Sequence, residues 1–197
     1  MAKTAAGARG VKTAAQARQI VKQRGLDYIK VGVFDGDGVL RGKYMGAEKF
    51  LAALDKGFGF CDVVLGWDSN DQLYDNTAFT GWHTGYPDAQ VRLLPDSCRD
   101  LPHEFDGRGL LFLGEFEGEA EEICPRGLLR RVLARATDMG LTATAALEYE
   151  FFLFDETPES AAAKGYRDLN PITPGNFGYS VLRGSTWADF HGALLKT

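Results

Sequence analysis

An amphipathic helix is predicted near the start of the chain, from Thr13 to Arg24. Ala17, Ile20 and Val21 recur at the spacing that places apolar side chains on one face of a helix. Basic residues fill the last turn and Gly25 follows, which is a common way for a helix to end. The apolar stripe is therefore expected to pack against a core.

The next part of the chain predicts a hairpin followed by a second helix. Apolar and other residues alternate from Tyr28 to Phe34, as they do in a half-buried strand. The Asp and Gly residues at 35–38 suit a tight turn, and a second strand is predicted from Val39 to Tyr44. Ala47 to Lys56 then carries a helical apolar stripe that ends at Gly57. This order is typical of an α+β sheet with a helix across one face.

Three further strands are predicted before the acidic middle of the chain. A short apolar strand lies within Cys61 to Leu65, and others cover Gln90 to Leu94 and Leu110 to Phe116. The acidic run from Glu115 to Glu122 is broken by a glycine and is interpreted as a solvated connection between domains.

A long helix is predicted to begin at Pro125, because proline is favoured at the first helical position. Gly140 ends it, and a strand is predicted to follow from Leu141 to Phe154. The arginines of the helix lie largely off its apolar stripe and are expected to face solvent. The stripe consists of Leu128, Leu129, Val132, Leu133 and Ala136.

Two glutamates one residue apart, Glu148 and Glu150, lie in this last predicted strand. The aromatic residues around them favour a strand that is at least half-buried. Because side chains alternate along a strand, both glutamates share a face, with Cα atoms about 6.6 Å apart. Two buried carboxylates so close together need a cation, and Mg²⁺ and Mn²⁺ prefer oxygen ligands. The alternative is an exposed edge strand whose glutamates face water.

The segment from Glu148 to Phe154 resembles the E-x-E-F-F-L-F motif of glutamine synthetases and their relatives, the γ-glutamyl amine ligases. Tyr149 stands where the usual family form has proline. The resemblance implies that Glu148 and Glu150 coordinate Mg²⁺ or Mn²⁺ in the active site. It also implies ATP as co-substrate, held mainly through metal and scattered side chains, and the sequence has no Gly-x-x-x-x-Gly-Lys-Ser/Thr loop.

A polar loop that contains Asp68 resembles the aspartate loop of the same family, usually Asp-Gly-Ser-Ser. Asp68 aligns with the family's aspartate, while the three residues that follow, at 69–71, depart from the usual sequence. The resemblance implies that Asp68 reaches the active site of a neighbouring subunit, where it helps to bind ammonium and withdraws its proton. The residues alone also fit a surface turn.

The resemblance implies an α+β fold in which an N-terminal β-grasp-like domain precedes the start of a glutamine-synthetase-type α/β catalytic domain. The expected divisions are a tail and helix at 1–25, the β-grasp-like domain at 26–119 and the catalytic domain at 120–197. Family members are much longer than these 197 residues. The catalytic domain is therefore expected to be truncated in this chain.

The composition narrows the classes of function and location. The net charge is −5, with 22 basic and 27 acidic residues, which argues against a nucleic-acid partner. No apolar run approaches the ~18 residues of a membrane span. The three cysteines form no Cys-x-x-Cys pair and the histidines are isolated, so a disulfide framework or zinc site is not expected. A cytoplasmic location follows as the expectation.

The expected function is that of an ATP-dependent ligase that joins ammonia to the γ-carboxylate of glutamate through γ-glutamyl phosphate. A ring-shaped homo-oligomer is implied by the resemblance, and no nucleic acid or membrane is expected as a partner. One alternative is a γ-glutamyl amine ligase that uses a larger amine. Another is a truncated, non-catalytic relative that only binds or oligomerises. A glycosidase is disfavoured, because its two acids usually come from separate strands or loops.

Overall fold

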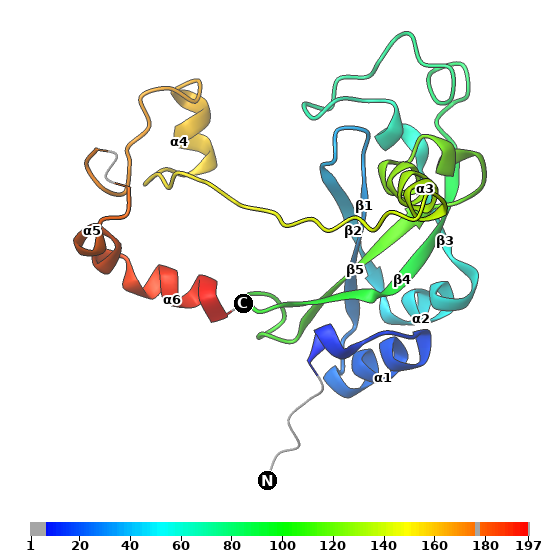
Figure 1. Cartoon of the computed structure of the whole chain (residues 1–197), viewed down its shortest axis with the longest axis horizontal. Helices are drawn as coiled ribbons and strands as arrows, with labels where there is room; N and C mark the ends of the chain where they lie inside the picture. Colours follow the sequence, from blue (N-terminus) through cyan, green and yellow to red (C-terminus); the bar gives the residue numbers. More distant parts are fainter. Residues whose placement is uncertain (1–6, 176–177, 197) are drawn as a thin grey trace. The chain divides into compact units, whose positions relative to one another are not determined.

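The computed structural model describes residues 7–175 and 178–196 (Figure 1). The chain divides into two compact units, Met1–Ala143 and Thr144–Thr197. Part of the expected N-terminal tail, residues 1–6, lies outside the described residues.

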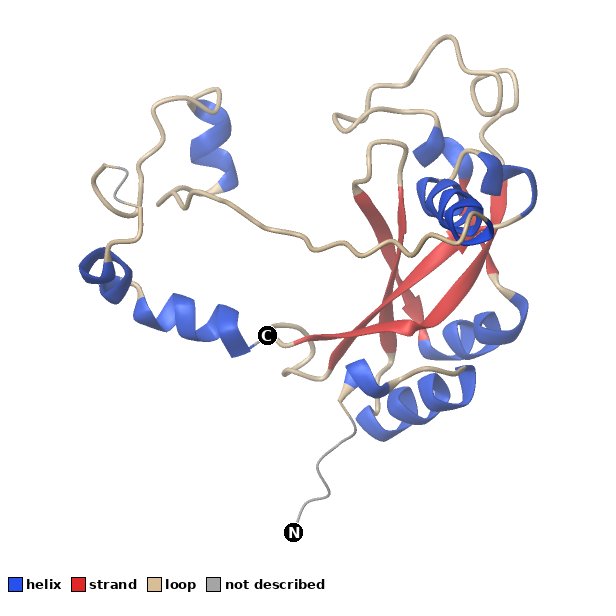
Figure 2. Cartoon of the chain, viewed as in Figure 1, coloured by secondary structure: helices blue, strands red, loops and turns tan. Residues whose placement is uncertain are grey.

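The N-terminal unit is built on a mixed sheet. Its described residues form five strands in the order β2-β1-β5-β4-β3 (Figure 2). β1 and β5 run parallel, and the other neighbouring pairs are antiparallel. The elements are η1 (Ala8–Gly10), α1 (Ala14–Arg24), β1 (Tyr28–Phe34), β2 (Leu40–Gly46), α2 (Ala47–Lys56), β3 (Phe58–Cys61), η2 (Asp62–Leu65), β4 (Asp88–Leu101), β5 (Gly109–Phe116), η3 (Gly118–Glu122) and α3 (Pro125–Asp138).

The first helix begins and ends on local signals. Thr13 accepts a hydrogen bond from the Gln16 backbone, and the Gln16 side chain accepts one from the Thr13 backbone. This reciprocal capping satisfies two amides that the helix leaves unpaired. Gly25 has a φ of 57°, in the left-handed region that glycine enters without steric cost. The predicted helix is confirmed.

The core lies where α1 and α2 cover the sheet. α2 packs on β1, β2 and β4, and α1 packs on α2 and β4. Phe50 of α2 is fully buried, and the centre of its ring lies 4.8 Å from the ring centre of Phe112 on β5. Buried aromatic pairs of this kind contribute both apolar area and ring contact. The apolar alternation of β1 is also buried, at Ile29, Val31 and Val33.

Gly57 lets the chain turn from α2 into β3. Its backbone has a φ of 67° and a ψ of −166°, a conformation that residues other than glycine rarely adopt. A Cβ at this position would lie 2.4 Å from the carbonyl oxygen of Val91 on β4. The close approach between these two segments therefore requires glycine.

Two predicted strands have different bounds. The strand expected at 61–65 lies earlier, at β3, because residues 62–65 form the 3₁₀ helix η2. The strand expected to end at Leu94 continues to Leu101, since a register shift between Leu94 and Arg99 accommodates Pro95. Proline is tolerated in a sheet at such irregularities.

The prediction that the whole acidic run is solvated is wrong for Glu115. This carboxylate is buried, and Arg92, Arg126 and Arg130 all donate to it. Its position on β5 turns it toward arginines that lie far along the chain, on β4 and α3. The arginines of α3 therefore hold this carboxylate as well as facing solvent.

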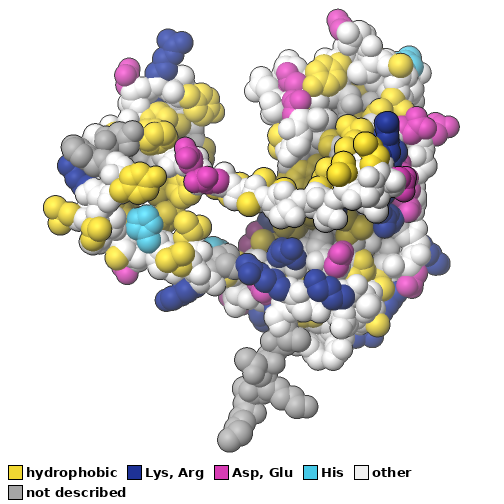
Figure 3. All heavy atoms as spheres, in the orientation of Figure 1, with side chains coloured by type: hydrophobic (Ala, Val, Ile, Leu, Met, Phe, Trp, Pro, Cys, Tyr) yellow, Lys and Arg dark blue, Asp and Glu magenta, His cyan; other side chains and the backbone are white. Residues whose placement is uncertain are grey.

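The C-terminal unit contains three short helices: α4 (Pro158–Ala163), α5 (Val181–Thr186) and α6 (Ala188–Lys196). No residue among 144–175 and 178–196 is buried. Hydrophobic side chains instead gather on its surface (Figure 3). Tyr149, Phe151 and Phe152 are 79%, 55% and 72% exposed.

The strand predicted from Leu141 to Phe154 does not form in the described chain. The segment is extended, and its pairing is limited to one bridge, between Phe154 and Pro171. A strand needs neighbouring strands to satisfy its backbone groups, and no described segment pairs with the backbone along 142–152. Aromatic content alone is therefore insufficient to make a strand here.

The architecture of the N-terminal unit is a mixed sheet with helices, in agreement with the α+β expectation. The finer β-grasp assignment stays a prediction. The domain division expected at residues 119 and 120 also stays a prediction, and the two compact units divide after Ala143.

Candidate active site

Glu148 and Glu150 lie on the extended segment of the C-terminal unit. Both residues are exposed, so the expectation that they are buried is wrong for this chain. Within the described residues, no group of three or more His, Cys, Asp or Glu side chains is placed to hold a metal ion. The two carboxylates are hard oxygen donors of the kind that Mg²⁺ and Mn²⁺ bind. Their identity as metal ligands stays a prediction.

The C-terminal unit contains a hollow of about 530 Å³, which is lined in part by the residues that come directly after Glu150 in the chain. Phe151, Phe152 and Leu153 contribute one part of its lining, and Trp187 and His191 contribute another. None of its described lining residues is an Asp or Glu. The hollow therefore has no carboxylate of its own for a cation, and it is mainly an apolar surface.

Asp68 lies in a tight loop of the N-terminal unit and is half-buried. Its Oδ1 accepts hydrogen bonds from the backbone amides of Asn70 and Gln72, both at 2.9 Å. The Asp68 amide donates to the Gln72 carbonyl, and Trp67 pairs with Leu73 across the loop. A side chain that holds its own backbone two residues on is a typical turn device. The loop therefore has a defined conformation around Asp68.

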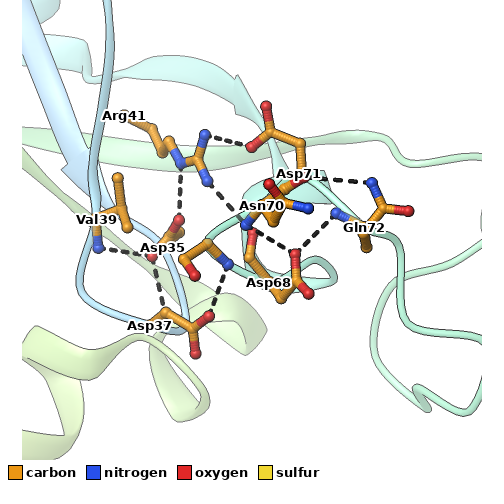
Figure 4. A network of polar contacts seen from close by, with 9 residues as sticks. Asp35, Asp37, Val39, Arg41, Asp68, Asn70, Asp71 and Gln72 are labelled. Atoms are coloured by element: carbon orange, nitrogen blue, oxygen red, sulfur yellow. Dashed lines mark hydrogen bonds and ion pairs between the residues drawn. The ribbon is translucent and has the colours of Figure 1, made fainter. Parts of the chain in front are cut away.

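Arg41 joins this loop to the turn between β1 and β2 (Figure 4). Its Nε donates to Asp35 at 2.7 Å, and its Nη1 donates to Asp71 at 2.6 Å. Nη2 donates to the Asp68 carbonyl at 3.4 Å, and the guanidinium lies 4.9 Å from the ring centre of Trp67. One side chain thus contacts three residues of the loop.

Asp35 fixes the other end of this network. Its side chain is fully buried, and its Oδ1 accepts from the amides of Asp37 and Val39. The Asp37 carboxylate reaches the loop in turn, where it accepts from the Ser69 amide at 2.7 Å. A buried carboxylate is retained only when it is paired and hydrogen-bonded, and both conditions hold for Asp35.

The carboxylates of the loop and of the β1–β2 turn raise the pKa of two nearby groups. Hydrogen bonding to Asp35 is the largest of the causes that raise the pKa of the Arg41 guanidinium above its ordinary value, and the bond to Asp71 adds to it. Burial raises the pKa of the Tyr74 hydroxyl, and the negative charges of Asp37 and Asp68 raise it further. Both groups therefore keep their protons at neutral pH, and both remain hydrogen-bond donors.

The structure brings Asp68 together with Asp35, Asp37, Asp71 and Arg41, which the sequence reasoning did not assign to a site. Aspartate and glycine in a turn signal a hairpin, and no spacing rule links residue 41 to residue 71. Asp68 belongs to the N-terminal unit, whereas Glu148 and Glu150 belong to the C-terminal unit.

Comparison with known families matches residues 122–189 to the glutamine synthetase catalytic domain. This range contains α3 and both glutamates. Two curated relatives match most of the chain. Type-1 glutamine synthetase 2 of Dictyostelium discoideum is 40% identical over 86% of this chain. The chain is therefore similar in sequence to glutamine synthetases. Glutamate–isopropylamine ligase of a Pseudomonas species is 37% identical over 91% of this chain.

The chain spans about a third of the length of these relatives, 33% of the first and 39% of the second. A third relative, the γ-glutamylethanolamide synthetase of Streptomyces coelicolor, is 34% identical over 80% of this chain and 34% of its own length. The three names describe ligases that differ in the amine they use. In the described part of the chain, no helix has the length and apolar character needed to cross a membrane.

Proposed function

We propose that this chain is part of an ATP-dependent ligase that forms a γ-glutamyl amide from glutamate and ammonia. The observation that carries the proposal is the match of residues 122–189 to the glutamine synthetase catalytic domain, because Glu148 and Glu150 lie inside it. Identities of 40% and 37% to a glutamine synthetase and a γ-glutamyl amine ligase support the same class. Glutamine biosynthesis and nitrogen metabolism are the corresponding roles.

The chemistry requires activation of a carboxylate, since its leaving group would otherwise be oxide. Phosphorylation of the γ-carboxylate of glutamate by ATP releases ADP and makes an acyl phosphate. An amine then attacks its acyl carbon, the amide C–N bond forms and inorganic phosphate leaves. Bound Mg²⁺ or Mn²⁺ supplies charge neutralisation on the phosphates. Glu148 and Glu150 have the right donor chemistry for such an ion and would provide part of its shell. Because both residues are exposed, the support for this role is their donor chemistry and the family match, and not burial.

Asp68 is proposed to accept the proton that the amine loses. A positioned carboxylate near an ammonium ion binds it by charge and removes a proton as the amine attacks. The loop supports this role, because Asn70 and Gln72 hold Oδ1. Within the described residues, Oδ2 of Asp68 accepts no hydrogen bond, so it is available to a substrate. This step is proposed to occur across subunits of a ring-shaped homo-oligomer.

The cellular setting is proposed to be the cytoplasm. Cys61, Cys98 and Cys124 are all free thiols in the described chain, which suits a reducing compartment. Burial raises the pKa of Cys98 to about 12, so this thiol is unreactive. Neither a nucleic acid nor a membrane is proposed as a partner, since the chain carries a net charge of −5.

A γ-glutamyl amine ligase that uses a larger amine is the second candidate. The isopropylamine and ethanolamide ligases among its relatives favour it, and so do residues 69–71, which differ from the usual Gly-Ser-Ser of the aspartate loop. A truncated form that only binds or oligomerises is the third candidate. Each predicts a different result in the experiment below.

The test uses the longest protein that the reading frame encodes. ADP release is measured with glutamate, ATP and a panel of amines from ammonia to ethanolamine and isopropylamine, and Mn²⁺ binding is titrated. Glu148→Ala is expected to weaken Mn²⁺ binding and abolish ADP release, whereas Glu48→Ala, at an exposed helix position, leaves both unchanged. Preference for a larger amine supports the second candidate. No amine-dependent ADP release by the unmodified protein would refute the ligase proposal.

A further inference from the structure

We infer that Arg41 is a positioning residue that holds Asp68 in the conformation needed to accept a proton. This inference rests on the proposed function of Asp68 and deepens it. The residues concerned are Trp67 to Gln72, which form the Asp68 loop, and the turn between β1 and β2. Arg41 joins these two segments, because it forms one ion pair with Asp35 in the turn and another with Asp71 in the loop.

The guanidinium contacts the loop before, at and after the proposed base. It lies over the Trp67 ring, which precedes Asp68, and pairs with Asp71, which follows it. It also donates to the carbonyl of Asp68 itself. Contacts on both sides of one residue restrain its backbone, and a planar guanidinium is able to stack and donate at the same time.

The arginine is itself held at a defined place. The side chain of Asp35 is 0% exposed, and it accepts a hydrogen bond from Arg41 Nε. The side chain of Arg41 is 18% exposed, which limits screening by water. The buried end of the network therefore anchors the loop to the sheet, rather than to another surface loop.

Electrostatics gives the arginine a second role. Asp35, Asp37, Asp68 and Asp71 place four carboxylates in adjoining turns, and like charges so near one another repel. Arg41 pairs with two of the four. The expected result of its loss is that Asp71 and the backbone around Asp68 move apart. Asp71 also has a φ of 61°, a conformation with a modest steric cost that other contacts must offset.

Loss of this restraint is expected to disturb a specific pair of hydrogen bonds. The Asn70 and Gln72 amides donate to Asp68 Oδ1, and they leave Oδ2 for the substrate. If the loop moves, these amides exchange with solvent and the carboxylate samples other orientations. Misplacement of a catalytic group by about 1 Å costs on the order of 100-fold in rate.

The test compares Arg41→Met and Arg41→Lys with Arg24→Met in the full-length protein. Arg24 is a matched control, because it is 11% exposed, pairs with Asp100 at 2.6 Å and donates to the carbonyls of residues 108 and 109, at the start of β5. Hydrogen exchange reports the amides of residues 68–72, and steady-state kinetics reports kcat/KM for the amine, glutamate and ATP. Asp68→Asn is measured beside them.

Arg41→Met is expected to speed exchange of the Asn70 and Gln72 amides while exchange in β1 and β5 stays unchanged. It is also expected to lower kcat/KM for the amine on the order of 10- to 100-fold, with KM for glutamate and ATP unchanged. Arg41→Lys is expected to restore part of the rate, because lysine keeps one ion pair and loses the planar fork. Arg24→Met is expected to leave loop exchange and amine kinetics unchanged.

The inference is overturned if Arg41→Met leaves loop exchange unchanged, or if it speeds loop exchange without lowering kcat/KM for the amine. A fall in every kinetic parameter together with faster exchange in β1 and β5 would indicate a structural role only and would also overturn it. Failure of the proposed base is a separate outcome: Asp68→Asn then retains the unmodified rate, while the exchange experiment still reports whether Arg41 holds the loop.

Discussion

The two units of the chain use similar local signals but differ in what they bury. Each has a helix that starts at a threonine capping box, and each has a run of aromatic and aliphatic residues. In the N-terminal unit, Phe112 is fully buried on a central strand, while Phe152 in the C-terminal unit is 72% exposed. β5 has strands on both sides, whereas no described strand pairs with the segment around Phe152.

The difference shows that a hydrophobic run becomes a core strand through its neighbours. Backbone amides and carbonyls must be paired before a segment is taken out of water, and a sheet supplies those partners. β5 gains them from β1 and β4. The comparison is open to four direct tests: two change one residue in each unit, and the other two examine a carboxylate within a single unit.

The largest expected contrast is between Phe112→Ala and Phe152→Ala. The first removes a buried ring from contact with Phe50 and is expected to lower the free energy of unfolding by about 3–5 kcal/mol. The second removes an exposed ring and is expected to change it by less than about 0.5 kcal/mol. Guanidinium denaturation of the full chain measures both. Equal losses would contradict the difference in burial.

The next contrast is within the N-terminal unit, between the buried Glu115 and a partly exposed glutamate two residues further on. Glu115→Gln is expected to lower the free energy of unfolding by about 1–3 kcal/mol, because three arginines lose the charge of a buried acceptor. The arginines are each close to 40% exposed, so water offsets part of the loss. The control is Glu117→Gln, at a partly exposed site nearby. A loss in the control as large as that in Glu115→Gln would show that burial is not the cause.

The capping boxes provide a third contrast of about 1 kcal/mol. Thr13→Ala is expected to lower the free energy of global unfolding by about that amount, because α1 packs on the core through Ala17, Ile20 and Val21. Thr157→Ala removes the same kind of cap from α4, which buries no residue. It is expected to fray that helix without a change in global unfolding. Denaturation and amide exchange of each helix separate the two outcomes.

The smallest effect is the acid response of Glu156 in the C-terminal unit. A hydrogen bond from Lys164, then bonds from Ser160 and the Asn170 amide, lower the pKa of Glu156 from 4.5 to about 2. Because the pKa is lower in the folded state, these bonds contribute fully above pH 4.5. Their contribution is lost as the pH falls from about 4.5 to about 2.

Carboxyl NMR titration of the unmodified chain measures this transition directly. Lys164→Met is expected to move the pKa of Glu156 upward, toward its ordinary value, since the largest cause of the shift is removed. A midpoint near 4.5 in the unmodified chain would show that the ion pair is not formed in solution. Ser160→Ala is the matched variant for the second cause, and a smaller upward shift is expected from it.

The candidate site was only partly accessible to sequence reasoning. Asp68, Glu148 and Glu150 were selected through their resemblance to family motifs, and the match over residues 122–189 supports the relationship. Arg41 was not assigned to the site from the sequence, because its partners lie 6, 27 and 30 positions away in the chain. A salt bridge between distant residues depends on how the turns are packed, and no local pattern encodes that packing.

The sequence alone determined those helices and strands whose signals all lie within one short segment of the chain. The bounds of β1 and α2 were predicted at Tyr28–Phe34 and Ala47–Lys56, and α1 was predicted from its cap and its glycine stop. Alternation, helical spacing and end residues act within a few positions of one another. These signals therefore do not depend on contacts between distant parts of the chain.

Tertiary structure alone decided where each carboxylate lies. Glu115 is buried because β4 and α3 bring arginines to it, although its sequence surroundings are acidic. Glu148 and Glu150 are exposed because no described strand pairs with their segment, although their sequence surroundings are aromatic. Burial depends on all the surfaces that pack around a residue. Those surfaces come from segments far apart in the chain, and a local sequence pattern does not show which of them meet.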